Sequence, residues 1–252
     1  MTEDRPIALI TGATSGIGEA SARLLSKNYR LIICGRRKRR LEDLQAELIG
    51  PSTLLSFDVN IKKEVFDAID SLSNEWKEID VLINNAGNAH GLDFIHEGKI
   101  DDWDAMIDSN VKGLLYVSKA VLPGMVARKK GHIINISSIA GLEVYPKGNV
   151  YCASKHAVDA LTKSMRLDLN QYGIKVTSID PGLVETEFSE VRFKGDSEKA
   201  RNVYKNYTPL KAIDIAETIE FILDRPSHVM IGDLLILPTD QASATLVNKK
   251  SS

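Results

Sequence analysis

The stretch that decides the fold is Ile7-Ala8-Leu9-Ile10-Thr11-Gly12-Ala13-Thr14-Ser15-Gly16-Ile17-Gly18. It opens with a short apolar run, which is typical of a strand covered on both faces. The glycines after it permit a tight turn and bring backbone N–H groups to the start of a helix, where the dipole favours an anion such as a pyrophosphate. Glycine-rich turns of this spacing also occur without a ligand, but the position directly after a first strand favours a dinucleotide site. Its candidate ligands are Gly12, Thr14, Ser15, Gly16, Ile17 and Gly18.

The same alternation of short apolar runs and helix-period segments continues along the chain. Such alternation predicts parallel strands joined by right-handed crossovers. We therefore predict one α/β domain over residues 1–252, with a single doubly wound, Rossmann-type parallel sheet of about seven strands and helices on both faces. The expected strands are Ile7–Thr11, Leu31–Gly35, Thr53–Phe57, Val81–Asn84, His132–Ser137, Lys175–Ile179 and Leu234–Leu237, and the expected helices lie near 17–27, 38–49, 61–74, 101–129, 150–172 and 212–224.

Composition excludes several classes of function. The 252 residues carry a net charge of −2 and are 43% hydrophobic, so nothing global favours nucleic acid or an anionic membrane. The two cysteines form no CxxC and the five histidines show no metal-binding spacing, so we expect no metal site. The first residues are polar, unlike a signal peptide, and no apolar stretch approaches the length of a membrane span. We expect a cytoplasmic protein.

A run of cations follows the second expected strand, in Cys34-Gly35-Arg36-Arg37-Lys38-Arg39-Arg40. An enzyme that uses NAD usually has an acid here for the ribose 2′-hydroxyl, whereas arginine accommodates a 2′-phosphate. A solvated helix face or a nucleic-acid patch would also explain the run. Cations in the first helical turn oppose the helix dipole, however, and a bound phosphate would offset that cost. We predict NADP(H), with Arg36 and Arg37 as ligands and the other three cations at the surface.

Two further loops follow expected strands at the same edge of the sheet. Asp58-Val59 comes after the third strand, where a carboxylate can accept from the adenine amino group. Asn84-Asn85-Ala86-Gly87 comes after the fourth, and by itself it is also a plausible turn. Its register with the other loops favours a wall of the dinucleotide cleft. We therefore add Asp58, Val59, Asn85, Ala86 and Gly87 to the predicted cofactor site.

A possible acid–base centre follows the fifth expected strand. Ser138 comes at its end, and Tyr151 and Lys155 lie one turn apart on the long helix after it. Hydride transfer to a carbonyl leaves an alkoxide that must take up a proton. A phenol has a pKa of about 10, and a nearby ammonium brings it toward the working range. Ser138 can donate to the substrate oxygen. A tyrosine–lysine pair alone is often only a surface contact, but its context here favours catalysis.

Together these motifs resemble the short-chain dehydrogenase/reductase superfamily over essentially the whole chain. The resemblance implies that Tyr151 is the proton donor and acceptor, that Lys155 holds the nicotinamide ribose and tunes the tyrosine, and that Ser138 polarises the substrate. It also implies that Asn110 anchors a water relay to the lysine, and that the protein is a homotetramer. The loop over the nicotinamide carboxamide would contain Pro181, Gly182, Val184 and Thr186.

Three segments are similar to NADP-dependent 3-hydroxy acid dehydrogenases: Gly148–Tyr151, Leu122–Val126 and Glu187–Asp196. This resemblance implies oxidation of small 3-hydroxy acids at the β-carbon, such as L-serine, L-allo-threonine and 3-hydroxypropionate, and reduction of malonic semialdehyde. Residues 186–211 would form a substrate lid. Because such an acid carries a carboxylate, we expect Arg192, or Lys194 near it, to bind that group. A solvated charge on the lid is the competing interpretation.

Two other functions use the same motifs. One is a broad-specificity NADPH-dependent carbonyl reductase with an open pocket, and the other is a non-catalytic NADP-binding sensor. The presence of Tyr151 and Lys155 argues against the sensor. The tail from Ala242 is either partly disordered or extends to a neighbouring subunit. The preferred acid, the direction of the reaction and the pathway are left open by the sequence.

Overall fold

The computed structural model describes residues 5–250, and its centre is one parallel sheet. The strand order is β3-β2-β1-β4-β5-β6-β9, and every neighbouring pair is parallel. Two sets of crossovers therefore wind outward in opposite directions from β1 and β4, and the prediction of a doubly wound sheet is confirmed. The strands are β1 (Ile7–Thr11), β2 (Arg30–Gly35), β3 (Ser52–Ser56), β4 (Ile79–Asn84), β5 (Gly131–Ile136), β6 (Ile174–Pro181) and β9 (Asp233–Ile236).

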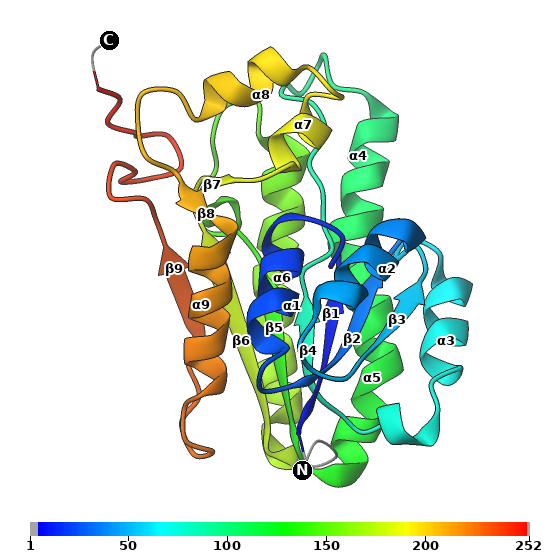
Figure 1. Cartoon of the computed structure of the whole chain (residues 1–252). Coiled ribbons are helices and arrows are strands. Elements are labelled where there is room, and N and C mark those ends of the chain that lie inside the picture. The colour runs from blue at the N-terminus through cyan, green and yellow to red at the C-terminus, as the bar shows by residue number, and fades with distance from the viewer. Residues whose placement is uncertain (1–4, 251–252) are drawn as a thin grey trace.

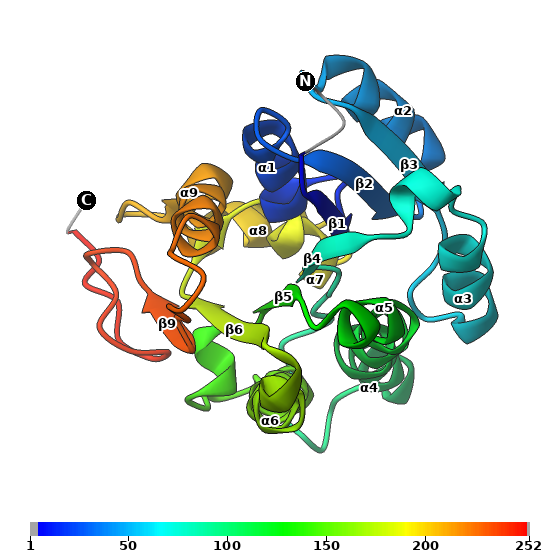
Figure 2. The ribbon, with the colours of Figure 1, turned by 90° about the horizontal axis from the view of Figure 1, so that it is seen from below.

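Helices cover both faces of the sheet. Figure 2 looks along the strands and shows α1 and α9 on one side of the sheet and α5 and α6 on the other. The long helices are α1 (Gly16–Leu25), α2 (Lys38–Glu47), α3 (Lys62–Asp70), α4 (Ile100–Ile107), α5 (Leu114–Arg128), α6 (Asn149–Leu169) and α9 (Ala212–Leu223).

Alternate residues of β1 enter two separate cores. Leu9 belongs to the cluster that contains Met125 of α5, whereas Ile10 belongs to the cluster that contains Leu25 of α1 and Ile219 of α9. All five side chains are fully buried. Burial of each such side chain contributes about 2 kcal/mol, so the continuous apolar run in β1 is what a strand between two helical layers requires.

The structure refines two of the expected helices. The helix predicted over 101–129 is divided: α4 runs into a π-helical turn at Asp108–Gly113, and α5 follows directly. The helix predicted over 150–172 leaves the α-helical geometry after Leu169 and ends in a 3₁₀ turn at Asn170–Tyr172. A π turn inserts one extra residue in the helix, which the period of the apolar positions did not reveal.

The segment 186–211, called the lid segment below, contains two short helices, α7 (Phe188–Arg192) and α8 (Ser197–Val203). Two short parallel strands, β7 (Val184–Glu185) and β8 (Leu210–Lys211), pair at its two ends. Figure 1 shows α7 and α8 above the carboxyl ends of the sheet strands, where ligands bind in this class of fold.

The tail after Gln241 packs on its own chain as far as the structure describes it. Val247 forms a bridge with Gln241, the backbone N–H of Ala244 donates to Glu143 Oε2 (2.8 Å), and that of Lys250 donates to the carbonyl of Asn206 (2.8 Å). The last two residues and residues 1–4, which carry the polar start of the chain, lie outside the described part. Among residues 5–250, every helix is too short or too polar to cross a bilayer.

A buried histidine in β5 makes the stability depend on pH. The hydroxyl of Thr177 donates to the carbonyl of Ile231 (2.7 Å), so His132 Nε2, at 2.9 Å from the same hydroxyl, is the donor of its bond. Burial lowers the pKa of His132 to about 4. An unfolded histidine takes up a proton near pH 6.5, whereas the native one stays neutral until about pH 4.

We predict that His132→Gln, whose amide can donate the same bond, reduces the loss of stability in acid. The stabilisation that depends on neutral His132 is complete above pH 6.5 and is lost as the pH falls toward 4. The free energy of unfolding of the parent protein, relative to that of the variant, should therefore fall by about 3 kcal/mol from pH 7 to pH 4. Urea unfolding of both proteins over this range measures the difference, and parallel curves would contradict the prediction.

Candidate active site

A cavity of about 520 Å³ opens at the carboxyl ends of the strands, under the lid segment. Loops after β1, β2, β3, β4, β5 and β6 contribute to its wall. It brings together nearly all the predicted site residues, and Gly18, Asn110 and the alternative carboxylate ligand Lys194 are absent from its lining. Those lining it are Gly12, Thr14, Ser15, Gly16, Ile17, Arg36, Arg37, Asp58, Val59, Asn85, Ala86, Gly87, Ser138, Tyr151, Lys155, Pro181, Gly182, Val184, Thr186 and Arg192.

The glycine-rich turn has the geometry that an approaching phosphate group needs. Gly12 and Gly16 adopt positive φ angles of 67° and 55°. A Cβ atom on Gly12 would lie 2.9 Å from Asn85 Nδ2, and one on Gly18 would lie 2.5 Å from the same atom. Gly18 therefore serves the packing of α1 rather than the cavity. Ser15, the N-cap of α1, makes no capping side-chain bond, which leaves N–H groups for an anion.

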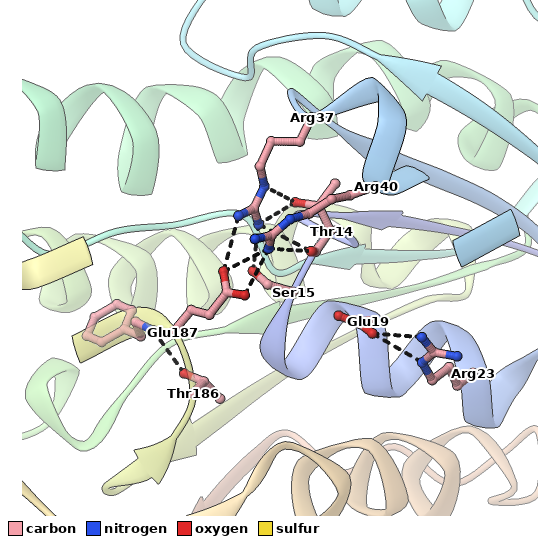
Figure 3. Close-up of polar contacts among 9 residues, drawn as sticks. Thr14, Ser15, Glu19, Arg23, Arg37, Arg40, Thr186 and Glu187 are labelled. Carbon is pink, nitrogen blue, oxygen red and sulfur yellow. Dashed lines mark hydrogen bonds and ion pairs between the residues drawn. The ribbon is translucent and has the colours of Figure 1, made fainter. Parts of the chain in front are cut away.

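Two arginines and a glutamate meet above this turn (Figure 3). Arg37 Nη2 donates to Thr14 Oγ1 (2.7 Å) and Ser15 Oγ (2.8 Å), and its Nη1 donates to Glu187 Oε2 (3.1 Å). Arg40 Nη1 donates to both carboxylate oxygens of Glu187, at 2.8 and 2.9 Å. Arg40 was predicted to be only a surface residue. It is exposed and does not line the cavity, but its guanidinium shares Thr14 and Glu187 with that of Arg37.

The other predicted adenosine-side residues form the rim. Arg36 is exposed, and its Nη1 lies 3.4 Å from Asp58 Oδ2. The second oxygen of that carboxylate accepts from the backbone N–H of Asn60 (2.9 Å). Val59 packs against Gly113 of the π turn. Asp58 is therefore held in place, and one of its oxygens is already shared with a cation.

The predicted acid–base residues lie together at the start of α6. Tyr151 is in the first turn of the helix, and Lys155 lies one turn later. Lys155 Nζ donates to the carbonyl of Ile136 at the end of β5 (2.9 Å). Ser138 lies two residues beyond that carbonyl, where its Oγ donates to the carbonyl of Pro181 (3.4 Å) and is close enough to Tyr151 to lower the pKa of the phenol. Tyr151 and Lys155, which are both buried, are thus placed against the end of β5.

Burial is the main cause of the pKa shifts of both Tyr151 and Lys155. Burial raises the pKa of Tyr151 and Tyr145 raises it further, whereas the Ser138 hydroxyl and the charge of Arg192 lower it by less. Burial lowers the pKa of Lys155 to about 8. The expectation that Lys155 brings Tyr151 toward neutral pH is not met. The Lys155 ammonium lies 6.0 Å from the ring centroid of Tyr151, and the loss of hydration outweighs the attraction of nearby cations.

Asn110 stands behind the cavity wall, in the π-helical turn. Its Nδ2 donates to Ser154 Oγ (2.9 Å) and to the carbonyl of Asn88 (2.9 Å), and its Oδ1 accepts from the backbone N–H of Asn88 (2.8 Å). A Cβ atom on Gly87 would lie 3.0 Å from Asn110 Oδ1 and 3.7 Å from Lys155 Nζ. The side chain thus fixes the loop that separates it from the lysine.

The two candidate carboxylate ligands of the lid segment have different surroundings. Arg192 lies in the cavity, where its Nε donates to the carbonyl of Gly91 (3.1 Å) and its Nη2 to Tyr145 Oη (3.1 Å). Its guanidinium carbon lies 5.5 Å from the ring centroid of Tyr151. Lys194 is exposed and forms an ion pair with Asp102 instead, with its Nζ 2.8 Å from Oδ1.

Comparison with known proteins places this geometry in a family. The family model for short chain dehydrogenases matches residues 6–197. The chain belongs to the short-chain dehydrogenase family. An NADP-dependent 3-hydroxy acid dehydrogenase of Salmonella typhi is 46% identical over 95% of this chain and 98% of its own length. The NADP-dependent 3-hydroxy acid dehydrogenase of Schizosaccharomyces pombe is 44% identical over 99% of this chain and 98% of its own.

Solved structures agree with this assignment. The closed form of a serine dehydrogenase complexed with NADP⁺ superimposes with a TM-score of 0.93 at 43% identity, covering 97% of this chain and 100% of that one. A serine dehydrogenase from Escherichia coli gives a TM-score of 0.82 at 38% identity, covering 94% and 99%. This short-chain dehydrogenase is an NADP-dependent oxidoreductase that acts on CH–OH groups. Its glycine turn, uncapped helix and paired arginines fit NADP(H).

Several residues of the cavity were not predicted from the sequence as site residues. Gln241 Oε1 accepts from the backbone N–H of Leu183 (2.9 Å) and so fixes the loop after β6. The ring of Phe188 lies tilted against that of Tyr151, with centroids 5.8 Å apart, and Tyr145 and Glu187 also line the cavity. Gln241 and Leu183, like Phe188 and Tyr151, lie far apart in the sequence, so no periodic pattern in the sequence could have indicated these contacts.

Proposed function

We propose that this short-chain dehydrogenase transfers a hydride between NADP(H) and the β-carbon of small 3-hydroxy acids, with Tyr151 as acid and base. The observation that carries the proposal is the position of Arg192, whose guanidinium carbon lies 5.5 Å from the ring centroid of Tyr151. A cation that can bind a carboxylate thus stands beside the acid–base group. When bound, NADP(H) donates or accepts the hydride.

Side chains at the start of α6 and after the end of β5 would transfer the proton. Burial keeps Tyr151 protonated at neutral pH, so it can donate a proton to the alkoxide that forms as a carbonyl is reduced. Ser138, which lines the same cavity, donates to the same substrate oxygen. Lys155, with a pKa of about 8, is mostly an ammonium at pH 7 and stabilises the phenolate that remains. Asn110 holds the loop behind Lys155 in place.

The rest of the cavity would hold the dinucleotide. The uncapped start of α1 suits the pyrophosphate, and Arg36 and Arg37 suit the 2′-phosphate. Asp58 and Val59 suit the adenine, and Tyr151 and Lys155 the nicotinamide ribose. The remaining proposed contacts are Gly12, Thr14, Ser15, Gly16, Ile17, Asn85, Ala86, Gly87, Pro181, Gly182, Val184 and Thr186.

The donors of Arg192 leave room for a carboxylate. Nε is used by Gly91, and one of the two N–H groups of Nη2 is used by Tyr145. Among residues 5–250, the structure gives Nη1 no partner, so the N–H groups of Nη1 and the second N–H of Nη2 remain to donate to a carboxylate. A carboxylate held there lies close to Tyr151. This short separation suits a substrate in which a single carbon lies between the carboxyl group and the carbinol carbon, as in a 3-hydroxy acid.

Replacement of Tyr151 by Phe should abolish turnover and leave the cofactor in place. The ring and its packing stay, but the proton donor is lost, so we expect kcat to fall by at least about a hundredfold. Absorbance of NADPH measures turnover, and calorimetry measures the Kd for NADP⁺, which should stay within about twofold. Normal turnover by the variant would overturn the role of Tyr151, and equally slow turnover by the parent protein would favour the non-catalytic sensor.

Replacement of Arg192 by Ala should separate acid substrates from neutral ones. Loss of a charge-assisted bidentate contact costs about 2–3 kcal/mol, so kcat/KM for L-serine should fall about 30- to 150-fold, with a much smaller change for an uncharged secondary alcohol. Lys194→Ala is the matched control, because that cation lies outside the cavity. Equal losses for both substrates would reject the carboxylate role, and efficient use of neutral ketones by the parent protein would favour a broad carbonyl reductase.

We also propose a homotetramer. β9 is an edge strand of the sheet, and Leu235 on it, Leu167 on α6 and Leu115 on α5 are exposed. These positions lie on the two long helices and the C-terminal strand, through which the subunits would pack. Light scattering should therefore give about four times the 27.8 kDa mass of one chain, and Leu235→Arg should lower it. A monomeric parent protein would exclude this assembly.

A further inference from the structure

An acidic side chain stands in the corner that the arginines prepare for a phosphate. Glu187 comes from the lid segment, far along the chain from Arg37 and Arg40, and its carboxylate reaches both of them (Figure 3). It lies with Thr14, Ser15 and Arg37 in the lining of the same cavity. Partial burial alone would raise the pKa of Glu187, but the bonds and charges of Arg40 and Arg37 outweigh it and lower that pKa. The carboxylate is therefore ionised at neutral pH.

The carboxylate of Glu187 takes up the one nitrogen of Arg37 that is not directed at the glycine-rich turn. Arg37 has five N–H groups, and the one on Nε and those on Nη2 are directed at Thr14 and Ser15. Only Nη1 faces away from the turn, and it donates to Glu187. A guanidinium holds a phosphate best through two parallel N–H bonds. While Glu187 accepts from Nη1, at most one N–H group of Arg37, the second on Nη1, is left for a phosphate.

Glu187 also takes up a donor of Arg40. Its Nη1 donates to both oxygens of Glu187, so a single carboxylate neutralises two cations that sit beside the pyrophosphate-binding turn. Arg36, by contrast, pairs with Asp58. A carboxylate bridging Arg37 and Arg40 is thus an internal substitute for an anionic ligand.

We propose that Glu187 is a specificity-determining residue that competes with the 2′-phosphate of the cofactor for Arg37 and Arg40. NADP(H) binds by displacing this carboxylate from the two guanidinium groups, whereas NAD(H), which carries a 2′-hydroxyl, does not. The phosphorylated cofactor binds only to the fraction of molecules in which the arginines are free. The larger the fraction in which Glu187 occupies them, the lower the apparent affinity for NADP(H). The inference rests on the assignment of Arg37 to the 2′-phosphate under the proposed function.

The solvent exposure of the three side chains determines how strongly Glu187 can compete with the 2′-phosphate. The side chains of Arg37, Arg40 and Glu187 are 44%, 47% and 42% exposed, so solvent screens the pairs and each is weak. The incoming phosphate carries close to two negative charges and is also repelled by the carboxylate. We expect removal of the charge of Glu187 to tighten binding of a 2′-phosphate about three- to tenfold.

Calorimetry with cofactor fragments tests the inference without any need for turnover. The probes are 2′,5′-ADP and 5′-AMP, which differ only in the 2′-phosphate, together with NADP⁺ and NAD⁺. Glu187→Gln should bind 2′,5′-ADP and NADP⁺ about three- to tenfold more tightly and leave 5′-AMP and NAD⁺ unchanged. Glu190→Gln is the matched control, since this exposed glutamate lies on the same short helix, and it should change none of the four affinities.

The outcomes separate this inference from the proposed cofactor site. Unchanged or weaker binding of 2′,5′-ADP by Glu187→Gln overturns the competition, and weaker binding would show that the glutamate orients the arginines instead. Arg37→Ala should weaken 2′,5′-ADP at least about tenfold. If it does and Glu187→Gln has no effect, the inference alone fails. If Arg37→Ala leaves 2′,5′-ADP unchanged, the assignment of the 2′-phosphate fails as well. Circular dichroism of each variant confirms that it is folded.

Discussion

The hydrogen bond from Lys155 Nζ to the carbonyl of Ile136 (2.9 Å) is the contact on which the reaction centre depends. It joins the first turns of α6 to the end of β5. Ser138 follows that carbonyl on the β5 side, and Tyr151 precedes the lysine on the α6 side, so one contact sets the position of both. The ammonium gives up most of its hydration for this place, and the pKa of Lys155 falls to about 8 as a result.

The same burial shapes the electrostatics of the whole cavity. Three cations line it: Arg37 above the glycine turn, Arg192 beside Tyr151, and Lys155 one helical turn after that tyrosine. In a partly enclosed cavity these charges act on an anionic ligand more strongly than they would in water. Burial also raises the pKa of Tyr151, so the residue waits as a phenol and ionises only when a negative charge on the substrate oxygen takes up its proton.

Much of this arrangement could be predicted from the sequence, because local patterns determine it. Continuous apolar runs such as β1 require two covering layers, and parallel strands place their following loops at one edge, so Gly12, Ser138 and Tyr151 were expected together. The π turn around Asn110 and the bridge from Glu187 to Arg37 and Arg40 depend on tertiary contacts that leave no periodic signal. The direction of the Tyr151 pKa was wrong because the spacing to Lys155 reveals a charge but not the loss of hydration.

The lid segment connects the two charged ends of the cavity through one short element. Glu187 is the N-cap of α7 and Arg192 is its last residue, and a helix of five residues is about 7.5 Å long. At its first end the carboxylate meets the arginines above the glycine turn, and at its other end the guanidinium meets Tyr145 and Gly91. β7 and β8 pair with each other and so hold the two ends of the segment together. Because Glu187 and Arg192 belong to one short helix, the carboxylate at the first end of the cavity and the guanidinium at the other are held at a fixed spacing by the same element.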